Sequence, residues 1–234
     1  MKTKLMKYQD DIYAIDQESA RSFLIIGKEK ALLFDAGIEP INIMELIRTV
    51  TKLPIIFVLS HADPDHIANA DKFETIFAHE KEIARCKEIE ALKTKRYVVL
   101  KDLDYINLGD KNLKVIFIPG HSKGHIGLID EITGDFFAGD TLSYGPIFLF
   151  VPNADILEYK KTLYQLKDRI YAGEIKKVYS CHNECPIVPE TVNDLLKCCE
   201  GYEDGTLRCI TPKEPLPFEG DIHLYKVNQC GILV

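Results

Sequence analysis

The segment at residues 60–66, Ser-His-Ala-Asp-Pro-Asp-His, most constrains how this chain can fold. It gathers two imidazoles and two carboxylates, and it directly follows the apolar run at residues 54–59, which predicts a buried β-strand. Nitrogen and oxygen donors at the end of a strand lie at the edge of a sheet, where they suit a divalent metal ion. The segment therefore predicts both a sheet and a metal site at its edge.

The length and composition indicate an ordinary globular protein. With 234 residues, of which 46% are hydrophobic and 28% charged, the chain can bury one large core without further covalent support. Neither an internal repeat nor a linker rich in Gly, Ser or Pro divides it. We therefore predict a single domain over residues 1–234.

Charge and hydropathy argue against several classes of partner. The formal net charge is -7 and the basic residues are scattered, so the chain offers no basic stripe for nucleic acid or for anionic lipid. No apolar run approaches the roughly 20 residues of a membrane span, and the N-terminus lacks the apolar core of a signal peptide. We expect a cytoplasmic protein, away from membranes, whose seven cysteines are reduced.

Strand and helix patterns alternate along the chain, which predicts an α/β fold in two similar halves. The predicted strands lie at residues 12–15, 23–26, 31–37, 54–59, 75–78, 113–118, 126–129, 136–140, 177–181 and 222–227. The predicted helices lie at residues 40–50, 67–73, 81–95, 154–170 and 189–200. Apolar residues at helical spacing indicate the helices, and short apolar runs bounded by turn residues indicate the strands.

Candidate metal ligands follow four of the predicted strands. They are the cluster from His61 to His66, then His121, Asp140 and His182. A single His or Asp after a strand is more often a cap or a turn residue. Four occurrences in chain order are much harder to explain in that way, and they favour a metal site.

Taken together, these motifs resemble those of the metallo-β-lactamase-fold hydrolases, a superfamily that includes glyoxalase II, lactonases and β-lactamases. The resemblance covers nearly the whole chain, and the motifs stand in family order. They are the strand end at residues 34–37, the cluster at 61–66, the loop at 119–125, the strand end at 138–142 and the late His182. The resemblance implies a four-layer αββα sandwich with its metals at one edge, between two sheets.

The same resemblance implies a site with two divalent metal ions. His61 and His121 would bind the first ion, Asp140 would bridge the two, and the second ion would be bound by Asp65, His66 and His182. Two further residues are expected beside the ligands. Asp35 would steady the metal-binding loops, while His125 is open to three readings: support of a ligand, a substrate-side donor, or an ordinary loop histidine.

Asp63 departs from the family pattern, in which a histidine usually stands at this position. It has two readings, because Asp63-Pro64 also matches a helix N-cap followed by proline at the first helical position. As a ligand of the first ion, Asp63 would make the two-metal cluster with its hydroxide neutral. A carboxylate there would also shift the preference from zinc toward iron or manganese.

The predicted function is that of a metal-dependent hydrolase that uses a metal-bound hydroxide on a small ester, thioester, lactone or related substrate. Asp65 would hold or shuttle the proton of the nucleophile. Two alternatives remain: a non-haem di-iron redox protein, resembling the flavodiiron core without its flavin domain, and a degenerate metal-binding module.

Two segments are expected to cover the metals and to select a small-molecule substrate: residues 81–103 and 142–155. The second is apolar and aromatic, so it suits either a lid or the contact of a homodimer. Cys181, next to His182, is interpreted as a small buried residue. His79 and His223 match no motif and are interpreted as ordinary histidines.

Overall fold

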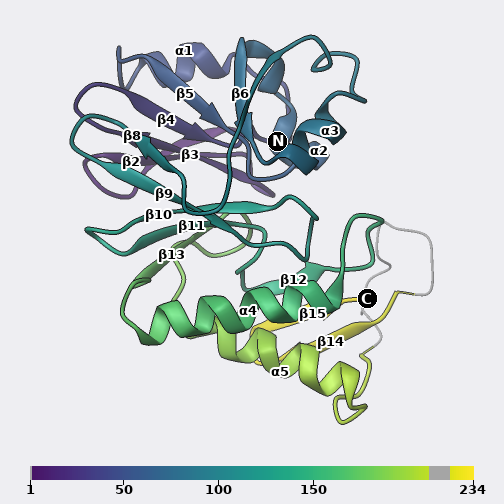
Figure 1. The fold of residues 1–234 in the computed structure, drawn as a ribbon. Helices are drawn as coiled ribbons and strands as arrows, with labels where there is room; N and C mark the ends of the chain where they lie inside the picture. Colours follow the sequence, from purple (N-terminus) through teal and green to yellow (C-terminus); the bar gives the residue numbers. More distant parts are fainter. Residues whose placement is uncertain (1, 211–221) are drawn as a thin grey trace. The chain divides into compact units, whose positions relative to one another are not determined.

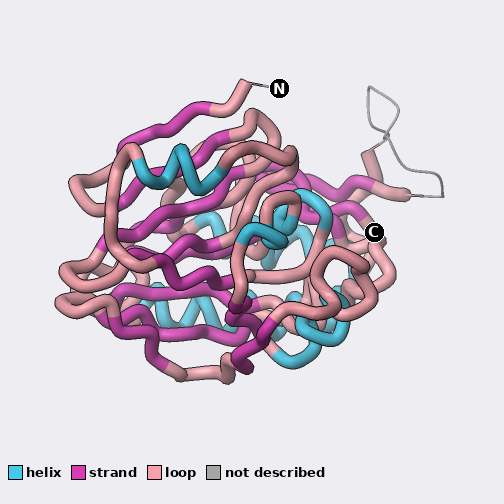
Figure 2. The backbone as a smooth tube through the Cα atoms, turned by 90° about the horizontal axis from the view of Figure 1, so that it is seen from above, coloured by secondary structure: helices cyan, strands magenta, loops and turns pink. Residues whose placement is uncertain are grey.

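The computed structural model describes residues 2–210 and 222–234, which form two compact units (Figures 1 and 2). The first unit comprises Met1–Phe117 and Gly124–Ile132, and the second comprises Ile118–Lys123 and Thr133–Val234. Strands, helices and the loops between them can be followed in Figure 2 by their colours. The prediction of one domain stays a prediction.

The first unit is built on a sheet that has seven strands among the described residues and that we call the large sheet. Its strands follow one another in chain order: β1 (Lys4–Lys7), β2 (Ile12–Asp16), β3 (Arg21–Ile26), β4 (Ala31–Phe34), β5 (Ile55–Val58), β6 (Thr75–Ala78) and β7 (Arg96–Val99). From β1 to β4 neighbouring strands are antiparallel, and from β4 to β7 they are parallel. Parallel neighbours require crossover connections, and these carry α1 (Ile43–Arg48), α2 (Pro64–Ile67) and α3 (Glu80–Cys86).

The core of the first unit lies between one face of the large sheet and these helices. Leu24, Leu33 and Phe57 of the sheet belong to one buried cluster with Ile47 of α1 and Ile83 of α3. All four residues of β4 are buried, so this central strand is covered on both faces. Such a strand reads as an uninterrupted apolar run. The first unit also contains three antiparallel strands, β8 (Tyr105–Asn107), β9 (Asn112–Phe117) and β10 (Ile126–Asp130).

The second unit contains a parallel strand pair, a small sheet and two long helices. The strand pair is β11 (Asp135–Gly139) and β13 (Lys177–Ser180). The small sheet has the order β12 (Gly145–Phe148), β15 (Cys230–Leu233) and β14 (Leu224–Val227). α4 (Ile156–Tyr171) and α5 (Thr191–Glu203) lie side by side, and α5 packs on β14 and β15 (Figure 1).

Most predicted elements occur within two or three residues of their expected bounds, but two helices were wrong. The helix predicted at residues 81–95 ends at Cys86 and is followed by turns and by β7. The short helix predicted at 67–73 is replaced by α2, which starts inside the donor cluster, and by a 3-10 helix at Ala70–Lys72. Strands β1, β7, β8, β12 and β15 were not predicted.

The segments predicted to cover the metals are partly regular structure. Residues 81–103 contain most of α3 and all of β7. Residues 142–155 contain β12, which pairs in parallel with β15, so this part is a strand of the small sheet and not a loose lid. Among the described helices, none combines the length and apolarity needed to cross a membrane. All seven cysteines are described, and none of them forms a disulfide.

Candidate metal centre

The first unit places the donor cluster directly after β5 and in the first turn of α2. His61 and His66 are fully buried, whereas the side chains of Asp63 and Asp65 retain 19% and 28% of their exposure. Because α2 starts at Pro64, the helix turns the chain within the cluster and brings the His66 amide to the Asp63 carbonyl oxygen, at 3.0 Å. Nε2 of His66 and Oδ2 of Asp65 lie 3.7 Å apart.

Asp35 fixes the orientation of the buried histidines through hydrogen bonds that involve their Nδ1 atoms. It follows β4 in a left-handed conformation (φ 66°), which Asp tolerates better than most residues. Its carboxylate accepts hydrogen bonds from the Ser60 amide (2.7 Å), from the Ser60 hydroxyl (2.7 Å) and from His66 Nδ1 (2.8 Å). Since Nδ1 of His66 is the donor, the lone pair lies on Nε2, the nitrogen that can bind a metal.

His61 is held in the same tautomer through Ser60. The Ser60 hydroxyl gives its one hydrogen to Asp35, so its oxygen accepts from His61 Nδ1 at 2.9 Å. The lone pair of His61 is therefore on Nε2 as well. The ring of His125, which precedes β10 and is fully buried, lies 4.5 Å from the His61 ring. Its role beside the ligands stays a prediction.

A helix N-cap was one of the two readings of Asp63, but its side chain does not cap the helix. It is the N-cap residue of α2 by position, and its side chain makes no capping hydrogen bond. One carboxylate oxygen, Oδ1, accepts from Nη2 of Arg85 at 2.6 Å. The other, Oδ2, lies 3.6 Å from Nε2 of His61.

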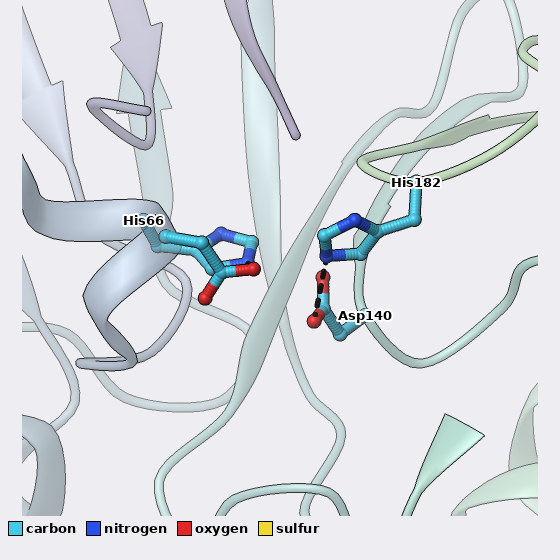
Figure 3. A group of neighbouring side chains, drawn as sticks. His66, Asp140 and His182 are labelled. Atoms are coloured by element: carbon cyan, nitrogen blue, oxygen red, sulfur yellow. Dashed lines mark hydrogen bonds and ion pairs between the residues drawn. The ribbon is translucent and has the colours of Figure 1, made fainter. Parts of the chain in front are cut away.

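The second unit brings together His121, Asp140 and His182. Asp140 follows β11 and His182 follows β13, and these parallel strands end at the same edge of their sheet. Nε2 of His182 lies 3.1 Å from Asp140 Oδ2, and Nε2 of His121 lies 3.7 Å from the same oxygen. Figure 3 shows the contact between Asp140 and His182, and it also labels His66 of α2.

Helix α4 and strand β12 hold His121 in place. Nδ1 of His121 donates to the carbonyl oxygen of Phe148 in β12 at 2.8 Å, which again leaves the lone pair on Nε2. Gly120 packs so tightly on α4 that a Cβ there would lie 2.3 Å from the Tyr159 Cα. The Tyr159 hydroxyl donates to the carbonyl oxygen of Thr141, next to Asp140, at 2.8 Å. One helix therefore positions two of the donors.

The distances between neighbouring candidate donor atoms fit a divalent ion. Ligands about 2.1 Å from a tetrahedral ion stand roughly 3.4 Å from one another. The observed separations are 3.6 Å for His61 and Asp63, 3.7 Å for His66 and Asp65, and 3.7 Å for His121 and Asp140. These distances are too long for hydrogen bonds but suit atoms arranged around a metal. Imidazole and carboxylate ligands together are compatible with zinc, iron or manganese.

Several supporting residues were not predicted from the sequence. They are Ser60, Glu82, Arg85 and Tyr159, together with the backbone carbonyl of Phe148. Ser60 alone carried a signal, since it precedes His61 directly. The other contacts join residues at least 18 positions apart, apart from the pairing of Glu82 with Arg85 within α3.

Comparison with known proteins gives a family match over most of the chain. A family model described as "Metallo-beta-lactamase superfamily" matches residues 15–182. A solved structure of a metallo-β-lactamase from Pontibacter korlensis superposes with a TM-score of 0.71, at 16% identity, over 85% of this chain and 99% of the other. The predicted α/β fold class of the metallo-β-lactamase type is thereby confirmed.

Two curated relatives carry names that describe hydrolases. One is an acyl-coenzyme A thioesterase, MBLAC2, from Bos taurus, 32% identical over 130 residues, or 52% of this chain and 47% of the relative. The other is a hydroxyacylglutathione hydrolase from Francisella tularensis, 31% identical over 120 residues, or 51% of this chain and 46% of the relative. The matches thus span about half the length of these relatives.

Proposed function

This chain belongs to the metallo-β-lactamase superfamily, and on that premise we propose that it is a metal-dependent hydrolase of a small acyl thioester. The main support is the set of three histidines, His61, His66 and His121, each held with its lone pair on Nε2 beside a carboxylate. The names of the two relatives favour thioesters among the esters, thioesters and lactones that the sequence allowed.

The proposed site takes two divalent ions. The first ion would be held by His61, Asp63 and His121 and the second by Asp65, His66 and His182. Asp140 would contribute to both. The presence of Asp63 adds a hard oxygen donor to the first site, which favours iron or manganese relative to an all-histidine site. Zinc stays compatible with every ligand in the set.

When bound, two such ions supply a Lewis acid for the thioester carbonyl and an acidified water as nucleophile. The side chains of the protein then divide the remaining work. Asp65, which is partly exposed, accepts the proton of the attacking water at a carboxylate oxygen. Asp35 keeps His66 in the metal-binding tautomer throughout turnover, because it accepts from Nδ1. A cytoplasmic location and a homodimer stay predictions.

The test combines metal analysis with a substrate panel. Protein purified without added metal is analysed for zinc, iron and manganese, and it is assayed with acyl-coenzyme A and acyl-glutathione thioesters, a carboxyl ester and a lactone. We expect metal-dependent turnover of a thioester.

His66→Ala and Asp140→Ala should abolish turnover and reduce the bound metal, while His223→Ala, outside the donor set, should retain both. Full hydrolysis by metal-free protein would contradict the proposal. An iron spectrum that responds to oxygen or reductant, without hydrolysis, would favour the di-iron redox alternative.

A further inference from the structure

Glu82 of α3 is a fully buried carboxylate that ties the donor cluster to the helix. Its Oε2 accepts from the Ala62 amide (2.9 Å) and from Nη1 of Arg85 (2.8 Å), and its Oε1 accepts from the Gly124 amide (2.8 Å). A buried charge is costly unless it is paired and hydrogen-bonded. A Cβ at Gly124 would lie 2.8 Å from Glu82 Oε1, so the close approach depends on glycine.

Arg85 joins this buried carboxylate to Asp63. It lies three residues after Glu82, on the same side of α3, and its guanidinium donates to Glu82 with Nη1 and to Asp63 with Nη2, at 2.8 and 2.6 Å. Burial acts to lower the pKa of Arg85, but the bond to Asp63 and the charges of Glu82 and Asp63 outweigh it and raise the pKa. The planar fork of an arginine can serve two carboxylates at once, which a lysine cannot do with the same geometry.

The two oxygens of Asp63 therefore have different partners. Oδ1 is bound to Arg85, and Oδ2 lies 3.6 Å from the ligand nitrogen of His61. That separation is close to the roughly 3.4 Å expected for two ligands of one tetrahedral ion. Unless something restrains it, an aspartate at an N-cap position bonds to the backbone amides of its own helix, and this one makes no such bond.

We propose that Arg85 is a positioning residue, which holds Asp63 by one oxygen so that the other serves as a single-atom ligand of the first metal ion beside His61. Asp63 stands where the family usually has a histidine. Arg85, which is itself bound by Glu82, is thus the residue that orients this aspartate. The inference rests on the proposed function only in taking His61 and Asp63 as ligands of that ion. It does not depend on the substrate.

The experiment is a double-mutant cycle read by metal affinity. Arg85→Met, Asp63→His and the double variant are titrated with Zn²⁺ and Mn²⁺ against a competing chelator, and bound metal is counted. In the wild-type background, Arg85→Met should weaken one of the two sites by roughly 10–100-fold and leave the other unchanged. In the Asp63→His background, which restores the usual family residue, Arg85→Met should change affinity by less than about threefold, because no aspartate remains to be positioned.

Three controls separate positioning from folding. Arg85→Met removes a partner of the buried Glu82 in both backgrounds and a partner of Asp63 in the wild-type background only. Urea unfolding of the metal-free proteins therefore measures the loss of stability in each background, so that it can be separated from the change in metal affinity. Arg85→Lys keeps the positive charge and should recover part of the lost affinity. Arg169→Met, which removes an ion pair with Glu174 (2.7 Å) in the second unit, should leave both affinities unchanged.

The possible outcomes are distinct. If Arg85→Met leaves both affinities intact, or weakens metal binding equally in both backgrounds, the positioning role is wrong, while thioester hydrolysis by the wild-type protein still supports the proposed function. If the first site persists in Asp63→Ala, Asp63 is not a ligand and the inference also fails. If the wild-type protein binds no metal, both the proposed function and this inference fall.

Discussion

At the scale of single residues, a change at Asp35 that barely alters the shape of the side chain is predicted to weaken metal binding. Asp35→Asn keeps the shape of the side chain but replaces one acceptor oxygen by an amide group. That group would face the Ser60 hydroxyl and His66 Nδ1, which both donate to Asp35 Oδ2 in this structure. The histidine would have to reverse its tautomer or lose the bond. We expect metal affinity to fall by roughly 10–100-fold, measured by competition with a chelator.

Asp16→Asn is the matched control for this change. Asp16 is also a buried carboxylate of the first unit, and its ion-pair partner is Arg21, at 2.6 Å. Its replacement should lower the urea midpoint without altering metal affinity. Equal effects of the two variants on metal binding would show that Asp35 acts only through general stability.

The candidate donors could be selected from the sequence because each follows a strand or lies in one short motif, and their role as metal ligands stays a prediction. The residues that orient them were not, with Arg85 as the clearest example. Its spacing from Glu82 is visible in the sequence of α3, but its bond to Asp63 spans 22 positions and depends on how α3 packs. Periodicity reports which face of a helix is buried. It carries no information about the partner that a polar side chain on that face will meet.

At the scale of elements, α4 determines whether the loop before His121 can form. Gly120 has φ 140° and packs against the backbone of Tyr159, where a Cβ would approach to between 2.3 and 2.6 Å. Gly120→Ala should therefore destabilise the protein through both backbone strain and overlap, and it should weaken metal binding because His121 is displaced. Gly173→Ala is the control, since Gly173 has φ 76° and a Cβ added there would meet no atom within 4 Å.

The difference between the two glycine variants isolates packing against α4. Gly173→Ala should cost about 1 kcal/mol, the usual penalty for a left-handed alanine, with metal affinity unchanged. Gly120→Ala should cost about 1–3 kcal/mol more, in the range of an overpacked site. Urea unfolding followed by circular dichroism measures both. If the two variants proved equally stable, α4 would not be bracing the loop.

Elements were predicted well where the apolar pattern is strong and poorly where turns imitate it. The strand at Thr75–Ala78 has the predicted bounds. The helix predicted to reach residue 95 stops at Cys86, because the chain continues in turns such as those closed by bonds from Ile89 to Cys86 and from Leu92 to Ile89. Successive three-residue turns bury apolar residues at nearly helical spacing, so the pattern alone does not separate them from a helix. Strands β1 and β8 are short and largely exposed, which leaves them without an apolar pattern.

At the scale of the whole molecule, buried thiols couple stability to pH in both units. Burial raises the pKa of Cys86, in the first unit, to about 11 and that of Cys199, in the second unit, to about 12. A thiol whose pKa is higher in the folded state favours folding fully only below its unfolded pKa, near 9.0. Above that pH the unfolded chain releases the proton first, so stability falls as pH rises toward 11 and 12. Each thiol contributes a slope of at most about 1.4 kcal/mol per pH unit.

This pH dependence also tests the prediction of a single domain. Each unit is made of two separate stretches of sequence, so the chain passes repeatedly from one unit to the other, which favours cooperative folding. We expect one calorimetric transition between about pH 8 and 10.5, a window that spans the unfolded pKa of the thiols, and both Cys86→Ala and Cys199→Ala should reduce the pH dependence of that same transition. Cys209→Ala, at an exposed position, controls for cysteine replacement. Because the chain has no tryptophan, circular dichroism and calorimetry are the suitable probes. Two transitions, each responding to the cysteine of one unit only, would mean that the units unfold independently and that residues 1–234 form two domains.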